Sequence, residues 1–187
     1  MRKRISIICA ILFPLISLAQ NKTQSISLEL FGAHNLVGVN YDTRFKGNTG
    51  LGYRVGVGYG YGSTSGLFVG DQTIKGVGVP VELNYLLGKK NNKLEVGVGT
   101  SLGIYHVNEE HVYYYLPTNE FPYGRTETHT IDENRFGYFL FGTLGYRYQR
   151  PEGFVFRVGI SPSFNFGDKC GLDKSLLYPY IGFGWSF

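Results

Sequence analysis

The 187-residue chain has few charges, few cysteines and no long apolar run after its first residues. Charged residues make up 17% of the sequence, and the only cysteines are Cys9 and Cys170. Because Cys9 lies in the N-terminal apolar segment, the rest of the chain cannot form an internal disulfide. No later apolar stretch approaches the ~20 residues that a membrane-spanning helix needs. The composition after the N-terminal segment therefore argues against a disulfide-stapled domain and a helical membrane protein.

The first 19 residues have the pattern of a cleaved secretory signal peptide. The basic Arg2-Lys3-Arg4 precedes an apolar stretch from Ile5 to Leu18, and Ser17-Leu18-Ala19 offers small residues for cleavage. An uncleaved helical anchor is the alternative, although the stretch is short. We expect residues 1–19 to be removed and residues 20–187 to form one domain. Removal of three basic residues would lower the formal charge from +4 to +1, so no nucleic-acid partner is predicted.

Glycine and aromatic residues dominate what remains, with 27 Gly, 15 Tyr and 14 Phe in the chain. Apolar and small residues alternate with a period of two, which is typical of a strand with one apolar face. Eight segments show this pattern: Gln24–Ala33, Leu36–Phe45, Leu51–Tyr61, Lys75–Leu87, Lys93–Tyr105, Arg135–Tyr148, Phe154–Phe166 and Leu177–Phe187. Short polar turns alternate with longer connections, which predicts an all-β, eight-stranded antiparallel up-and-down barrel.

The side-chain sizes on the two strand faces decide between two kinds of barrel. A soluble lipocalin-like barrel would need the polar face outside, but that face consists mostly of Gly and Ser. The other face carries bulky Phe, Tyr, Leu and Val, which are too large for the interior of eight strands. A transmembrane barrel with small residues in its lumen and large residues toward lipid fits both faces.

The charges in the middle of the strands all fall on the non-apolar face. Buried charges need partners of opposite sign, and this set is balanced. We therefore expect a salt-bridged plug in the half of the lumen near the short turns, with separately hydrated charges as the alternative. Its members are Glu29, Asp42, Arg44, Arg54, Glu82, Glu95, Arg147 and Arg157.

The C-terminal segment carries the most specific motif of the chain. Gly182-x-x-Trp185-x-Phe187, with Tyr180 two residues before the glycine, is similar to the C-terminal signal that the barrel-assembly machinery recognises. The chain as a whole resembles the small OmpA/OmpX-type outer-membrane barrels of Gram-negative bacteria, and in particular the barrel-domain proteins of Bacteroidetes, a porin-like family. The resemblance implies a location in the cell outer membrane. Eight strands bring both mature termini to the side of the short turns, which we expect to be periplasmic, and we expect a monomer. The resemblance also implies lipid and the assembly machinery as partners, but no single activity.

The long connection between the fifth and sixth segments is the leading candidate for a functional surface. Its flanks continue to alternate, which predicts a hairpin over residues 106–134 that protrudes from the cell surface. Exposed edges and aromatic side chains suit a surface-protein or secretion-system partner. A hairpin folded back over the barrel mouth is the alternative. The candidate partner-binding residues are Tyr113, Tyr114, Tyr115, Phe121 and Tyr123.

Other activities find weaker support in the sequence. His106 and His111, with nearby Glu109, Glu110 and His129, could contact a metal, but no spacing matches a known site, so no metal or other cofactor is predicted. A lipid A-modifying enzyme would need a set such as His106 with Ser101 or Ser161, and no oriented third member is evident. A small-solute channel is a further alternative that a filled lumen disfavours. No catalytic residue is predicted.

Overall fold

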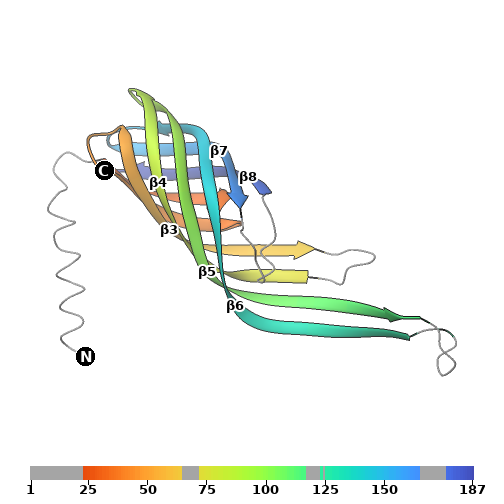
Figure 1. The fold of residues 1–187 in the computed structure, drawn as a ribbon. Coiled ribbons are helices and arrows are strands. Elements are labelled where there is room, and N and C mark those ends of the chain that lie inside the picture. Colours follow the sequence, from red (N-terminus) through yellow and green to blue (C-terminus); the bar gives the residue numbers. More distant parts are fainter. Residues whose placement is uncertain (1–22, 65–71, 117–122, 124, 165–175) are drawn as a thin grey trace, which may run out of the picture.

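Eight strands close into a barrel in the computed structural model, which describes residues 23–64, 72–116, 123, 125–164 and 176–187. Each strand pairs antiparallel with its neighbours in sequence (Figure 1). The predicted all-β, eight-stranded up-and-down architecture is confirmed. The expected signal peptide, Phe121 and Cys170 lie outside the described residues. The strands are β1 (Gln24–Phe31), β2 (Val37–Arg44), β3 (Gly50–Thr64), β4 (Gln72–Lys89), β5 (Asn92–Tyr115), β6 (Arg125–Gln149), β7 (Gly153–Phe164) and β8 (Leu176–Ser186).

The first and last strands close the barrel, as expected from the C-terminal alternation. The register of β1 with β8 runs from Ser25 opposite Ser186 to Phe31 opposite Tyr180. Beyond the last strand residue, the backbone of Phe187 still exchanges hydrogen bonds with Gln24, at 2.9 and 3.1 Å. Closure matters because an open strand edge presents unpaired backbone groups. Within the described residues, no helix is long and apolar enough to cross a bilayer.

The two faces of the wall differ as the alternation predicts. Outward-pointing apolar side chains are exposed on every strand, for example 40% for Val158 and 65% for Val98. Inward-pointing side chains are buried, and many are charged or polar. The wall therefore carries a continuous apolar belt outside and a polar interior. One belt residue from each strand, in order, is Leu28, Val39, Val57, Leu83, Val98, Leu144, Val158 and Phe183.

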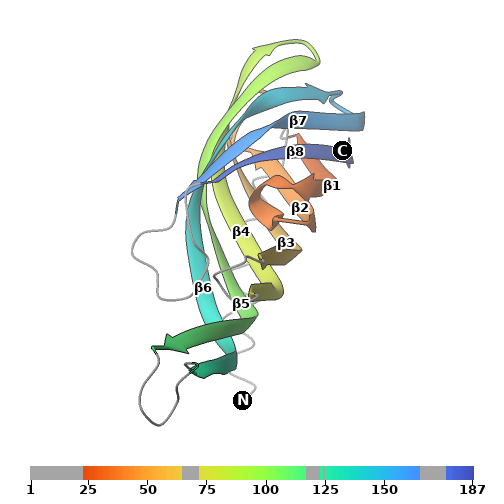
Figure 2. The ribbon, with the colours of Figure 1, turned by 90° about the vertical axis from the view of Figure 1, so that its right-hand side faces the viewer.

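The two ends of the barrel have different connections. β2–β3, β4–β5 and β6–β7 are joined by short turns, and β1 begins and β8 ends on the same side. We call this side the short-turn end. At the opposite end, which we call the long-loop end, β5 and β6 run far beyond β1, β2, β7 and β8 (Figures 1 and 2). The expected protruding hairpin is therefore present, and it projects away from the barrel instead of folding over its mouth.

The first turn at the long-loop end corrects the predicted extent of β1. The strand was expected to reach Ala33, but it ends at Phe31, and residues Gly32–His34 form a single 3-10 turn. Phe31, Gly32 and Asn35 all adopt positive φ, between 57° and 65°, which reverses the chain in a few residues. The Phe31 N–H donates to the Leu36 carbonyl at 2.8 Å. This tight reversal turns the His34 side chain inward, where it is buried. The other strand ends differ from the predicted ones by a few residues, apart from the hairpin.

Candidate functional site

The structure brings the eight strand charges together inside the barrel, and all of them are buried. Toward the short-turn end, the Arg44 guanidinium donates to both carboxylate oxygens of Asp42, at 2.7 and 2.8 Å. Arg147 approaches the same Asp42 carboxylate at 3.0 Å and also donates to the Ser25 hydroxyl. Asp42 is thus held by two arginines from different strands, which is the pairing that a desolvated carboxylate requires.

Glu95 is the centre of this network. Its carboxylate lies 2.8 Å from Arg157 Nε, 3.2 Å from Arg147 Nη1 and 3.8 Å from Arg54 Nη1. It also accepts a hydrogen bond from the Asn84 amide at 3.0 Å. The side chain is fully buried. Glu95 therefore connects three arginines that come from β3, β6 and β7, across the interior of the barrel.

A second group of pairs lies beside Glu95. Arg157 Nη1 lies 2.6 Å from Glu29 Oε2, and Arg54 Nη1 lies 3.4 Å from the same oxygen. Arg54 also pairs with Glu82, which completes the balanced set. The Arg157 guanidinium stacks over the Tyr180 ring at 5.1 Å, a favourable cation–π arrangement. The charges therefore form one connected cluster and not a series of isolated ions.

Uncharged residues that we did not predict complete the network. Asn84 donates to Asp42 at 2.8 Å, and Asn40 donates to Glu29 at 3.4 Å. Both asparagines stand two residues from a predicted charge on the same strand face, so alternation alone could have identified them. His34, whose Nε2 lies 2.9 Å from Asn40 Oδ1, had no such signal because it belongs to a turn.

Large side chains also fill the lumen, contrary to the expectation that its residues are mostly small. Ala33, Phe139 and Phe141 form a buried apolar cluster, and Tyr105 and Tyr180 are buried as well. Glycines opposite these aromatic rings leave space for them, because a glycine has no side chain. A Cβ added at Gly99 would lie 2.7 Å from the Phe141 ring, and one at Gly145 would overlap the Tyr180 hydroxyl. The lumenal glycines therefore accept the rings of other strands.

One of these close contacts yields a prediction about the turn residue His34. A Cβ added at Gly58 would overlap His34 Nδ1. Gly58→Ala should therefore lower the free energy of unfolding by about 1–3 kcal/mol, the range for overpacking. Combining it with His34→Ala should cost less than the sum of the two single changes, because the overlap with the imidazole ring is removed and only the 2.8 Å approach to the His34 Cβ remains. Urea titration in detergent micelles measures this. Gly62→Ala is the control, since no atom lies within 4 Å of its added Cβ; additive effects would contradict the contact.

The protruding hairpin carries the predicted tyrosines at its end. Tyr113, Tyr114 and Tyr115 are the last three residues of β5 and are all exposed, and Tyr123 is fully exposed. Tyr113 points to the same face as His129, with the rings 5.5 Å apart in a T-shaped arrangement. The structure thus groups four of the five candidates near the tip.

The two weak metal candidates do not come together. His106 lies on the outward face, 3.2 Å from both Asp132 Oδ1 and Asn134 Oδ1. His111 lies on the opposite face, 3.5 Å from Glu109. Within the described part of the chain, no three His, Cys, Asp or Glu side chains are placed to hold one metal ion.

The serine and histidine residues considered for catalysis are also separated. Ser101 and Ser161 are buried in the lumen, each 1% exposed. His106 belongs to the outward-facing set of β5, whereas Ser101 belongs to the inward-facing set of the same strand. The Ser161 hydroxyl instead donates to the Gly142 carbonyl at 2.9 Å. The geometry provides no nucleophile and base pair from these residues.

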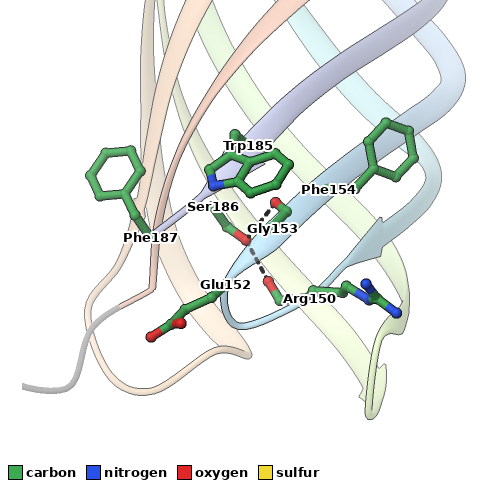
Figure 3. Close-up of a pocket in the computed structure, with 7 residues that line it drawn as sticks. All are labelled: Arg150, Glu152, Gly153, Phe154, Trp185, Ser186 and Phe187. Carbon is green, nitrogen blue, oxygen red and sulfur yellow. Dashed lines mark hydrogen bonds between the residues drawn. The ribbon is translucent and has the colours of Figure 1, made fainter.

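The residues of the C-terminal motif occupy the closing strand. Trp185 and Phe187 point outward and are exposed, while Tyr180 and Gly182 are buried on the inward face. Trp185 and Phe187 line a cleft of about 540 Å³ at the short-turn end, beside the β6–β7 turn (Figure 3). Its floor is fixed by Ser186, whose hydroxyl lies within hydrogen-bond distance of the Arg150 and Gly153 carbonyls.

Comparison with known proteins gives likenesses among solved structures. No family model matches the chain, and no curated protein matches it. The chain is similar to the N-terminal β-barrel domain of Pseudomonas aeruginosa OprF, with 13% identity, coverage of 90% of this chain and 98% of that chain, and a TM-score of 0.46. It is also similar to Ail, the attachment invasion locus protein of Yersinia pestis, with 15% identity, coverage of 89% and 97%, and a TM-score of 0.43. The strand pairing of the chain itself closes the barrel.

Proposed function

We propose that this protein is an integral outer-membrane barrel whose plugged body anchors the β5–β6 hairpin as an interaction surface outside the cell. The observation that carries the proposal is the length of the hairpin. Its ladder continues from His106 opposite Asn134 to Tyr115 opposite Arg125. The β6–β7 register begins only at Leu140. Among the described residues, the Thr126–Asn134 backbone pairs with β5 on one side and with no strand on the other.

A strand edge of this kind suits a partner that adds a strand of its own. Backbone hydrogen bonds would supply affinity, and alternate side chains would supply selectivity. Residues 106–116 and 125–135 include five carboxylates and two arginines, so a basic partner strand is favoured. The exposed tyrosines at the tip add apolar contact area. We propose that the partner is a surface protein or a component of a secretion system.

The membrane placement is supported by the apolar belt, which has exposed side chains on all eight strands. A soluble protein rarely leaves so much contiguous apolar surface in water. The lumenal network supports an anchoring role over a channel role, because Glu95 and its three arginines cross the interior. In this placement the short-turn end, with both termini, faces the periplasm. Membership of the OmpA/OmpX-type family, including its Bacteroidetes group, stays a prediction, as does the monomeric state.

The proposed interaction can be tested by site-specific photo-cross-linking on intact cells. A cross-linking side chain at Thr128, on the β6 edge, should give a discrete protein adduct because a partner strand would lie beside it. The same side chain at Tyr85, on the outward face near the short-turn end, should contact lipid alone. Immunoblots of irradiated cells report the adducts. Absence of any discrete adduct from Thr126, Thr128 and Thr130 would contradict the proposal.

A further inference from the structure

The cleft at the short-turn end carries an inference beyond the hairpin. We propose that it binds the headgroup of one phospholipid that bears both a phosphate and a primary ammonium group. The inference rests on the proposed membrane placement. Three outward aromatic side chains, from Phe154, Trp185 and Phe187, line the cleft together with the charged Arg150 and Glu152 (Figure 3).

The position of the cleft relative to the apolar belt points to a lipid. Phe154, Trp185 and Phe187 are 44%, 62% and 54% exposed and continue the belt to its edge. Aromatic rings of this kind favour the interface between hydrocarbon and headgroups. The β6–β7 turn, with its two charges, lies just beyond them. Acyl chains can therefore run along the aromatic side while the headgroup reaches the turn.

The charges of the turn select the headgroup. Arg150 stands on the Phe154 side of Trp185, and Glu152 stands on the Phe187 side (Figure 3). The guanidinium suits a phosphate, which it can bind through two parallel hydrogen bonds. The Glu152 carboxylate suits a primary ammonium, and it would repel a headgroup with only negative charge. A quaternary ammonium has no N–H to donate, so it satisfies Glu152 less well.

The floor of the cleft is ordered by contacts within the described chain. The Ser186 side chain is buried, and its hydroxyl lies 3.1 Å from the Gly153 carbonyl, which ties the turn to β8. Gly153 has a φ of +114°, a backbone conformation that other residues rarely adopt. The Arg150 N–H meets the Phe154 carbonyl at 3.4 Å. The turn backbone is therefore ordered, whereas the exposed side chains of Arg150 and Glu152 point to opposite sides of it (Figure 3) and must rotate toward the cleft to contact one headgroup.

Native mass spectrometry of the refolded protein tests this site. The probes are phosphatidylethanolamine, phosphatidylglycerol and phosphatidylcholine with identical acyl chains, at equal concentration. We expect the ethanolamine lipid to be retained about tenfold more than the other two, as one added charge-assisted contact allows. Arg150→Gln should reduce retention of all three lipids. Glu152→Gln should abolish the preference, and Glu152→Lys should transfer it to phosphatidylglycerol.

Two controls show whether the charges of the β6–β7 turn select the lipid. Lys90→Gln, in the equivalent β4–β5 turn, removes a charge at the same end of the barrel and should leave the preference unchanged. Free phosphoethanolamine should not compete, because it lacks the acyl chains. Equal retention of the three lipids, a preference that survives Glu152→Gln, or a dimer of the chain in place of lipid adducts would overturn the site. Failure of the protein to enter vesicles would overturn the membrane placement instead.

Discussion

Replacing Glu95 with alanine should lower the free energy of unfolding by about 3–5 kcal/mol, the cost of leaving buried charges without their partner. The side chain is fully buried and lies within 4 Å of Arg54, Arg147 and Arg157. Its loss would leave one fewer carboxylate to balance these three guanidinium groups, all of which are buried. Urea-induced unfolding in phospholipid vesicles, followed by tryptophan fluorescence, measures the change.

A matched carboxylate outside the barrel provides the control. Glu133 pairs with Arg135 on the hairpin, and its side chain is 48% exposed. Exposed ion pairs contribute about 0–1 kcal/mol, so Glu133→Ala should have a small effect. Glu95→Gln, which keeps the shape and removes the charge, should fall between the two. If Glu95→Ala costs no more than Glu133→Ala, the lumenal charges are separately hydrated and do not stabilise one another.

Replacing Val98 with arginine should destabilise the protein in vesicles by about 2–4 kcal/mol, the cost of a cation at the middle of a bilayer. Val98 points outward from β5 with 65% exposure, and its cross-strand neighbours are Leu83 and Gly142. In water the same substitution would place a charge on an exposed surface and cost little. The effect therefore reports directly on whether the belt contacts lipid.

The hairpin again supplies the control residue. Val112 lies on the same strand and the same face as Val98, but beyond the end of the β4 ladder. Val112→Arg should change the unfolding free energy by no more than about 0.5 kcal/mol, as is usual at surface positions. Vesicle-bound protein unfolded by urea gives both values. If Val98→Arg leaves the free energy of unfolding unchanged, the belt does not lie in a membrane.

Much of the barrel could be predicted because alternation identifies the face of each side chain. All eight predicted charges are buried for this reason. The pairing of β1 with β8 could be predicted because eight strands that alternate in direction bring the first and the last together as antiparallel neighbours. Alternation does not give the conformation of a turn. Ala33 was therefore assigned to β1, and the inward His34 was missed, because positive φ at Phe31 and Asn35 has no periodic signal.

The contents of the lumen were harder to predict for a related reason. Phe141 and Tyr105 point inward, yet they fit only because glycines on a neighbouring strand leave room for them: Gly99 beside Phe141, and Gly76 and Gly78 beside Tyr105. Whether a ring meets a glycine depends on register and on contacts across the barrel, which one sequence does not contain. Glu95 shows the same difficulty. The sequence predicts that its side chain points inward, but not that Arg54, Arg147 and Arg157 from three other strands pair with it.

The strand order also has a consequence for how the molecule folds. β5 and β6 are neighbours in sequence. Their pairing runs from Asn92 opposite Tyr148 to Tyr115 opposite Arg125, and it can form stepwise starting from the end near Tyr115. β1 and β8 are joined through pairs such as Ser25 with Ser186, at opposite ends of the chain. Bringing distant segments together costs more loop-closure entropy than pairing adjacent ones. We expect the β5–β6 hairpin to form early and the β1–β8 seam to form last, so a kinetic intermediate would be an open, curved sheet.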